Sequence, residues 1–440
     1  MKYFIFTIAA FGVPPFGFVL SQNLRWIKYA FIGIAVAMCL YQGTSINFFS
    51  YEDYRGSSRG MEVSLAHLMA FSVIFALAMR QNIRRWIPDG GFRLFVLYFL
   101  ACLPSLATAE NTLFAFFEIW KMIMTYFFSL AIYAYLCASE DLTTTVKALA
   151  YFTIVNFCAV ISQRFTGVYQ AHGLFPHQNS MAMAMQLVGP IFFSLFLLNG
   201  PKTKLGRLGM IAFFAAAIAT VRTFSRGALA MMPVAYGLSA MVCFFKGSKT
   251  HVVKRVMPLV FVGVIGALAM LPKIIERFTE APESSASTRV ELAKCAWEMI
   301  KDEPWRGVGI NNWGIKINEP YPYAERAGRE VNRGEDFRDG IVESVYLLVG
   351  AECGIPALLL MFLWFVWYFR ISCKLARKLD DSRMAAIPIG CVGAFPALAA
   401  QCCLEWVLRQ QLNLMCLVFV FAILSYLNEA GNSAKMAEED

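Results

Sequence analysis

Charged residues are scarce in this sequence of 440 residues. Only 16% of its residues are Asp, Glu, Lys or Arg, whereas 58% are hydrophobic. A soluble domain is roughly one quarter charged and about half apolar, and the mean hydropathy here is +0.55. This composition excludes an ordinary soluble domain and predicts a protein that crosses a membrane several times.

Several kinds of functional site are also missing. The sequence has four histidines, and His172 and His177 have no carboxylate or thiol nearby in sequence, so no metal site is expected. The twelve cysteines are spread through apolar segments, which argues against a disulfide framework. The net charge of +9 gathers in short connections rather than in a basic groove, so nucleic acid is not an expected partner. We see no internal repeat. The first apolar run is not followed by a small-residue cleavage site, so we expect this run to be a membrane span that is not cleaved.

Thirteen apolar segments approach the roughly 20 residues that a spanning helix needs. They are 4–20, 26–40, 63–79, 92–107, 113–136, 146–161, 181–198, 208–221, 228–245, 256–271, 345–369, 384–403 and 412–427. We therefore predict an all-α fold, a polytopic membrane helical bundle of 12–13 transmembrane helices.

The distribution of Lys and Arg predicts the orientation. The connections rich in these residues are 80–85, 202–207, 246–255 and 370–383. The positive-inside bias places them in the cytoplasm, so the segments 42–60, 166–180, 222–227 and 405–410 fall on the other face together with a large polar loop. The expected divisions are an N-terminal transmembrane bundle (1–272), a large loop on the outer face (273–342), C-terminal transmembrane helices (343–427) and a cytoplasmic tail (428–440).

The loop of residues 273–342 is the one sizeable polar stretch, with eleven basic and thirteen acidic residues. Thr288–Glu291 has the form of a capping box and predicts the start of a helix. An apolar stripe follows at i, i+4, i+7 and i+8, which predicts a short amphipathic helix that ends before Pro304. The stripe consists of Leu292, Ala296, Met299 and Ile300. Residues 305–313 indicate a tight glycine turn, and 319–340 indicate a lid or loop.

Ionisable residues within or beside apolar segments are candidates for function, because their desolvation is costly. Glu118 and Lys121 lie three residues apart in one segment. Either they neutralise each other, or Lys121 faces an anionic ligand and Glu118 modifies the electrostatic environment of Lys121. His67 is interpreted as a hydrogen-bonded packing residue.

Two turns on the outer face carry further polar groups. In the first, either Gln178, Asn179 and Ser180 cap the span that follows, or His177 and Gln178 contact a substrate. The second, 222–227, is a short turn between two spans, and it carries two arginines. Arg222 and Arg226 either reach lipid headgroups or bind a pyrophosphate through paired hydrogen bonds.

Four stretches in order resemble the O-antigen ligase and polymerase superfamily of bacterial membrane glycosyltransferases. They are 172–179, 223–227, Arg289 with Trp297 and 302–309, and 346–356. The resemblance implies a helical-bundle enzyme of the inner membrane. Such an enzyme takes a glycan from undecaprenyl pyrophosphate on the periplasmic side and passes it to a hydroxyl acceptor on lipopolysaccharide or another surface polysaccharide. It needs no nucleotide sugar, metal or other cofactor.

The resemblance also implies roles for individual residues. The basic residues that bind the pyrophosphate correspond to Arg226 and Arg289, with Lys121 as a further match. Ligases of this kind usually carry a histidine at the end of the loop, where this chain has Glu343. Either Glu343 takes over as the catalytic base, or the acceptor chemistry differs, or Glu343 only caps the next helix. From the resemblance as a whole we predict an O-antigen ligase-like glycosyltransferase. A polymerase of the same superfamily is the nearest alternative, and a polar-lipid transporter is a third.

Overall fold

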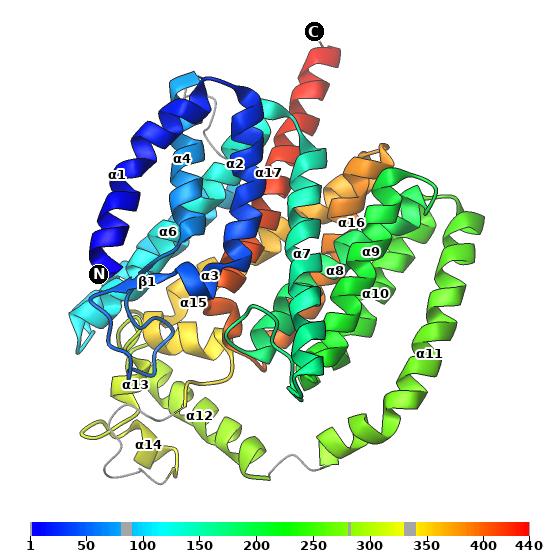
Figure 1. Cartoon of the computed structure of the whole chain (residues 1–440). Helices are drawn as coiled ribbons and strands as arrows, with labels where there is room; N and C mark the ends of the chain where they lie inside the picture. The colour runs from blue at the N-terminus through cyan, green and yellow to red at the C-terminus, as the bar shows by residue number, and fades with distance from the viewer. Residues whose placement is uncertain (1, 81–89, 280–282, 330–339, 440) are drawn as a thin grey trace.

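The computed structural model describes residues 2–80, 90–279, 283–329 and 340–439. Within these ranges the chain forms seventeen α-helices, two short 3₁₀ helices and one sheet of two strands. Figure 1 shows the long helices side by side, with α12 and α14 at one end of the bundle, which we name the loop end. The predicted all-α polytopic membrane bundle is confirmed.

Each of the thirteen predicted apolar segments corresponds to a helix. The corresponding helices are α1 (Lys2–Ser21), α2 (Leu24–Cys39), α4 (Leu65–Arg80), α5 (Gly90–Cys102), α6 (Thr112–Ser139), α7 (Leu142–Phe165), α8 (Gln178–Asn199), α9 (Lys204–Arg222), α10 (Arg226–Lys246), α11 (Lys249–Thr279), α15 (Val345–Lys378), α16 (Ser382–Gln401) and α17 (Gln411–Glu439). Among the described residues, ten helices are long and apolar enough to cross a membrane. The predicted number is larger partly because it counts α2 and α4, which have 16 residues each and are about 24 Å long.

The remaining described elements lie between these helices. They are α3 (Tyr41–Thr44), β1 (Ile46–Phe48), β2 (Met61–Val63), η2 (Leu103–Ala107), α12 (Glu283–Asp302), α13 (Trp313–Lys316), α14 (Tyr323–Arg326) and η3 (Val407–Arg409). The strands β1 and β2 pair antiparallel, with Ile46 opposite Val63.

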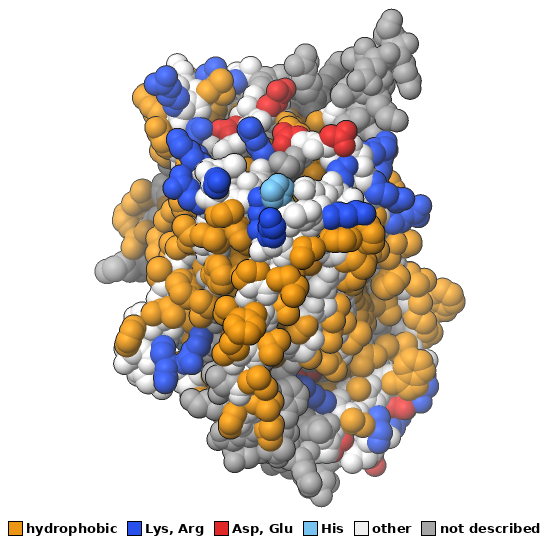
Figure 2. Space-filling view, turned by 90° about the vertical axis from the view of Figure 1, so that its right-hand side faces the viewer, with side chains coloured by type: hydrophobic (Ala, Val, Ile, Leu, Met, Phe, Trp, Pro, Cys, Tyr) orange, Lys and Arg blue, Asp and Glu red, His pale blue; other side chains and the backbone are white. Residues whose placement is uncertain are grey.

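The centre of the bundle is formed by α8 and α17, which are buried along nearly their whole apolar length. Helix α8 packs against α9 and α16, and α17 packs against α6. Figure 2 shows a wide belt of hydrophobic side chains across the face that it draws, with Lys and Arg gathered above and below the belt. A belt of this kind, bordered by charge at both edges, is what a bilayer requires of a spanning protein.

Helix α12 carries the predicted apolar stripe on its buried face. The four residues of the stripe are buried in a second apolar cluster, which also includes Trp313 and Leu348. The helix ends at Asp302, before Pro304, as predicted. It begins at Glu283, however, so the prediction that Thr288 starts the helix is wrong. Because residues 283–287 are already helical, Thr288 lacks the non-helical backbone that a capping residue needs.

The predicted glycine turn after α12 is confirmed, and it fits against a kink in α15. Gly307 and Gly309 have φ values of +72° and +117°, which glycine adopts most readily. The amide of Val308 donates to Ala351 O at 2.8 Å. A Cβ at Gly307 would lie 2.3 Å from the carbonyl carbon of Glu352. Only a glycine therefore allows the loop to approach α15 this closely.

The predicted lid, 319–340, contains the single helical turn α14. Tyr323 and Ala324 of this turn are buried against the α12 cluster. Residues 330–339, which make up much of the predicted lid, lie outside the described residues.

Candidate active site

A cavity of about 340 Å³ opens at the loop end of the bundle. This volume is within the range of small-molecule binding pockets. We name it the arginine cavity. Its lining residues are His177, Gln178, Asn179, Phe224, Ser225, Arg226, Gly227, Ala230, Arg289, Glu343, Leu404 and Glu405. They come from the starts of α8 and α10, from α12, and from the segments before α15 and η3.

The structure brings together five of the seven residues that the sequence nominated. They are His177, Gln178, Arg226, Arg289 and Glu343. Arg222 and Lys121 are not among the lining residues. The two arginines of the cavity come from helices α10 and α12, which are separated along the chain by the whole of α11.

The turn before α10 explains why Arg226 faces the cavity and Arg222 does not. Phe224 has a φ of +50°, and its ring stacks on Tyr169 with the ring centroids 5.1 Å apart. Thr223 Oγ1 accepts the amide hydrogen of Ser225 at 3.2 Å. The chain therefore reverses sharply between α9 and α10. The Arg222 guanidinium lies beside the Phe224 ring, 5.7 Å from its centroid.

Helix α8 is capped by His177, so the predicted capping by Gln178, Asn179 or Ser180 is wrong. The backbone of His177 is extended, and its Nδ1 accepts the amide hydrogen of Asn179 at 3.2 Å. Loss of hydration and the nearby His172 lower the pKa of His177, which favours the neutral ring that can accept this hydrogen bond. The capped residues use their side chains elsewhere. For example, Gln178 Nε2 donates to Gln170 Oε1 at 3.0 Å.

Glu343 forms an ion pair with Arg289. Both side chains are about one third exposed, at 34% and 33%. The alternative that Glu343 caps α15 is wrong, because Ser344 is the N-cap and its side chain accepts from the amide of Leu347. Glu343 therefore lies just outside the helix, where its carboxylate reaches the cavity.

Glu405 is a lining residue that the sequence analysis missed. Only 5% of it is exposed, and Asn179 Nδ2 lies 2.8 Å from both of its carboxylate oxygens. Burial, followed by the nearby Glu343, raises the pKa of Glu405 to about 7, although Arg289, Asn179 and Arg226 oppose the rise. Its position in a short connection between two apolar segments was the available signal, since a carboxylate there is costly.

Lys121 belongs to a separate ionic network inside the bundle. Its Nζ lies 2.6 Å from Glu118 Oε2. Arg409 contacts the other oxygen of Glu118 at 2.9 Å and Glu352 at 2.6 Å. No side chain of these four is more than 6% exposed. The structure therefore favours the interpretation that Lys121 and Glu118 neutralise each other, within a network that the sequence analysis did not identify.

Glu352 lies in one of the stretches that carried the resemblance, and it has a structural position. Besides its contact with Arg409, its Oε1 accepts the amide hydrogen of Trp313 at 3.3 Å. It therefore ties the glycine turn of the loop to α15 and η3.

His67 is a hydrogen-bonded packing residue, as predicted. It is 1% exposed, and its two ring nitrogens lie 3.1 Å from the amide of Ser64 and 3.2 Å from Gln411 Nε2.

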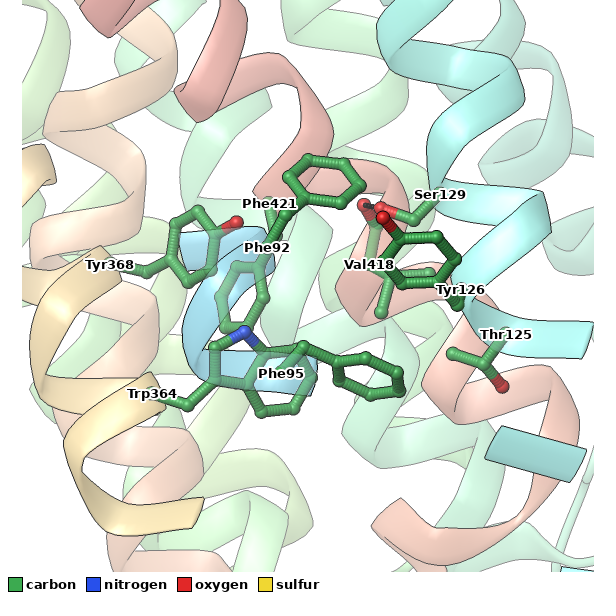
Figure 3. Close-up of a pocket in the computed structure, with 9 residues that line it drawn as sticks. All are labelled: Phe92, Phe95, Thr125, Tyr126, Ser129, Trp364, Tyr368, Val418 and Phe421. Carbon is green, nitrogen blue, oxygen red and sulfur yellow. Dashed lines mark hydrogen bonds between the residues drawn. The ribbon is translucent and has the colours of Figure 1, made fainter. Parts of the chain in front are cut away.

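A second cavity lies among aromatic side chains of α5, α6, α15 and α17 (Figure 3). Figure 3 shows Trp364, Tyr368 and Phe92 on one side and Tyr126, Ser129 and Thr125 on the other. Its volume is about 10 Å³, which is room for a single water molecule at most. It is too small for any ligand larger than water, so the arginine cavity is the candidate site. The described residues contain no group of three or more His, Cys, Asp or Glu that could hold a metal ion.

Residues 211–362 match the sequence model of the family described as O-antigen ligase. This match supports the resemblance to the O-antigen ligase and polymerase superfamily that the four stretches indicated. No curated protein matches the chain. The matched range contains seven of the twelve lining residues, and Arg226, Arg289 and Glu343 are among them. His177 and Glu405 lie outside it, at the other walls of the same cavity.

Proposed function

We propose that this protein is a membrane glycosyltransferase that moves a glycan from undecaprenyl pyrophosphate to a hydroxyl acceptor in the arginine cavity. The observation that carries the proposal is the presence of Arg226 and Arg289 in one cavity. Guanidinium groups are permanently charged and hold phosphate oxygens through paired hydrogen bonds. Two of them suit the two phosphates of the donor.

The reaction in this proposal is a displacement at the anomeric carbon of the donor glycan. The acceptor hydroxyl forms the new bond to that carbon, and the bond from the carbon to the phosphate oxygen breaks. The pyrophosphate leaves with the electron pair of the broken bond. Because this leaving group is already an anion, cations stabilise its departure and an acid is not required. Arg226 and Arg289 supply the cations.

The hydroxyl proton needs an acceptor, and Glu343 is the proposed general base. Its carboxylate lies beside Arg289 at the cavity wall. When Arg289 turns to the bound pyrophosphate, the carboxylate of Glu343 becomes available to the acceptor hydroxyl. Donor binding thereby prepares the base for the attacking group.

The proposed location is the bacterial inner membrane, with the loop end in the periplasm. This orientation rests on the Lys- and Arg-rich connections at the opposite end of the bundle, such as 246–255 and 370–383. A lipid-linked donor would then reach the cavity from the membrane. A transporter is less well supported, because transporter sites are built near the midplane from broken helices, whereas Arg226, Arg289 and Glu343 gather at one end.

The acceptor distinguishes a ligase from a polymerase. The position at which ligases carry a histidine is occupied by Glu343, and this difference keeps the polymerase as a second candidate. Deletion of the gene separates the two. Unattached lipid-linked polymer in the deletion strain supports a ligase, and single lipid-linked repeat units support a polymerase.

The same strain tests the proposal itself. Complementation with the parental gene should restore the surface polysaccharide, and complementation with Arg226→Ala should not, at equal protein levels in the membrane. An unchanged surface polysaccharide in the deletion strain would contradict both candidates.

A further inference from the structure

The arginine cavity contains a second carboxyl group, Glu405, which has no part in the displacement described above. It lies on the connection between α16 and η3, and only 5% of it is exposed. Asn179 Nδ2 lies 2.8 Å from each of its oxygens. The side chain is therefore held in place at the wall of a cavity that is proposed to bind an anion.

The charges that face Glu405 come from four walls of the cavity. His177 and Asn179 belong to the start of α8, Arg226 to α10 and Arg289 to α12, and Glu343 precedes α15. His177 accepts a hydrogen bond from a backbone amide through Nδ1, so this nitrogen carries no proton. With both glutamates ionised, the two arginines are fully compensated. A pyrophosphate diester, which carries two negative charges, would then enter a cavity without net positive charge and beside a buried carboxylate.

We propose that Glu405 binds the donor as a neutral carboxylic acid that donates its O–H to a phosphate oxygen of the pyrophosphate. The identity of this ligand rests on the proposed function. In the acid form, Asn179 donates to the carbonyl oxygen of Glu405, and the hydroxyl oxygen keeps its own hydrogen for the ligand. The cavity then has a net charge of one positive unit and one additional donor. Glu405 is thus a binding residue, and it keeps its proton throughout transfer.

The environment of Glu405 favours this form. Burial and Glu343 already raise its pKa to about 7 before any ligand is bound. A bound dianion adds negative charge nearby, which favours the neutral form further. Carboxylic acids kept neutral by their surroundings are known to act as hydrogen-bond donors in enzyme sites.

The consequence is that donor binding takes up one proton when the pH is above the pKa of free Glu405. Affinity should be constant well below pH 7 and should fall as the pH rises through about 7, by up to tenfold for each further pH unit. The sign follows from the raised pKa, because the binding form is the protonated form and it becomes depleted above that value.

The test is a binding titration of the purified full-length protein with a dialkyl pyrophosphate diester. This probe carries a constant charge from about pH 5.5 to 8.5, since both of its ionisations are those of strong acids, whereas Glu405 titrates inside that range. The parental protein should bind more weakly at the upper end of the range. Glu405→Gln, whose amide resembles the neutral acid and keeps a donor, should bind within about threefold of the parental affinity at low pH and should show no pH dependence.

Two further variants sharpen the result. Glu405→Leu removes the donor and should bind about tenfold more weakly at low pH, in line with the loss of one hydrogen bond to a charged group. Glu343→Gln removes the carboxylate that helps to raise the pKa of Glu405, so the midpoint of the pH dependence should move to lower pH.

The outcomes separate this inference from the proposed function. Probe binding that does not change with pH in the parental protein overturns the role of Glu405 and leaves the pyrophosphate site intact. Loss of binding in Glu405→Gln at low pH also overturns it. Absence of probe binding at every pH overturns both the ligand and the inference.

Discussion

Arg289 and Glu343 form an ion pair that joins α12 to the residue preceding the N-cap of α15. The pair fixes the loop helix at the edge of the arginine cavity, with each side chain about one third exposed. Under the proposed function, a bound pyrophosphate draws Arg289 away from Glu343, and donor binding and release of the base are then linked through this one ion pair.

Replacement of Arg289 tests this link. Arg289→Ala should lower transfer at least 10²-fold, as expected when a group that stabilises a developing anion is lost. Arg289→Lys should restore transfer only in part, because an ammonium group lacks the forked donors of a guanidinium. The measurement is glycan transfer in purified membranes that contain equal amounts of protein. Arg164→Ala is the matched control, since Arg164 is an exposed arginine at the end of α7; equal losses in both variants would contradict the role of Arg289.

Glu343 is tested by removing its charge while keeping its shape. Glu343→Gln should lower turnover by roughly 10²-fold or more, which is the usual contribution of a general base, while binding of the donor persists. Glu343→Asp should keep part of the activity, because a carboxylate remains. A Gln variant that transfers glycan at the parental rate would show that the base lies elsewhere in the cavity.

Arg409 neutralises Glu118 and Glu352 inside the bundle. Arg409→Met should destabilise the protein by about 3–5 kcal/mol, because a buried charge is left without its partner. The double variant Arg409→Met, Glu352→Gln should regain much of this loss, since Glu118 keeps Lys121 at 2.6 Å. Thermal unfolding of the protein in detergent measures both effects. A double variant no more stable than Arg409→Met would contradict this description of the network.

The orientation is tested with topology reporters at three positions. Fusions after Lys249 and Lys378 should report the cytoplasm, and an insertion at Gly328 should report the periplasm, because the Lys- and Arg-rich connections lie at the former two sites. Gly328 has a φ of +73° and open space around it, so the insertion should be tolerated. A cytoplasmic signal at Gly328 would place the arginine cavity on the wrong face for a periplasmic transfer.

Local patterns in the sequence predict much of this fold. Apolar length identified every long helix of the bundle, and the period of Leu292, Ala296, Met299 and Ile300 predicted the buried face of α12. Both patterns depend on neighbours within a few turns of helix. The start of α12 was mispredicted, because the motif at Thr288 is equally compatible with a position inside a helix.

The residues of the site were predicted less completely, because residues that contact one another there lie far apart in the sequence. Asn179 and Glu405 are 226 residues apart, and Glu352 and Arg409 are 57 apart. Such pairs depend on how helices pack, which no local period encodes. The sequence could place Arg226, Arg289 and Glu343 on the same side of the membrane. It could not show that Glu405 lines their cavity, or that Arg409 neutralises Glu118 and Glu352.

The central claim is that the arginine cavity transfers glycan from a lipid-linked pyrophosphate. The most direct measurement uses the purified protein in liposomes with an undecaprenyl pyrophosphate-linked glycan and a hydroxyl acceptor, and follows the release of undecaprenyl pyrophosphate. The parental protein should release it together with the transferred glycan, and Arg226→Ala should release at least 10²-fold less. Equal release by the parental protein and Arg226→Ala, or none by the parental protein with either a lipid A-core or a second lipid-linked glycan as acceptor, would contradict the claim.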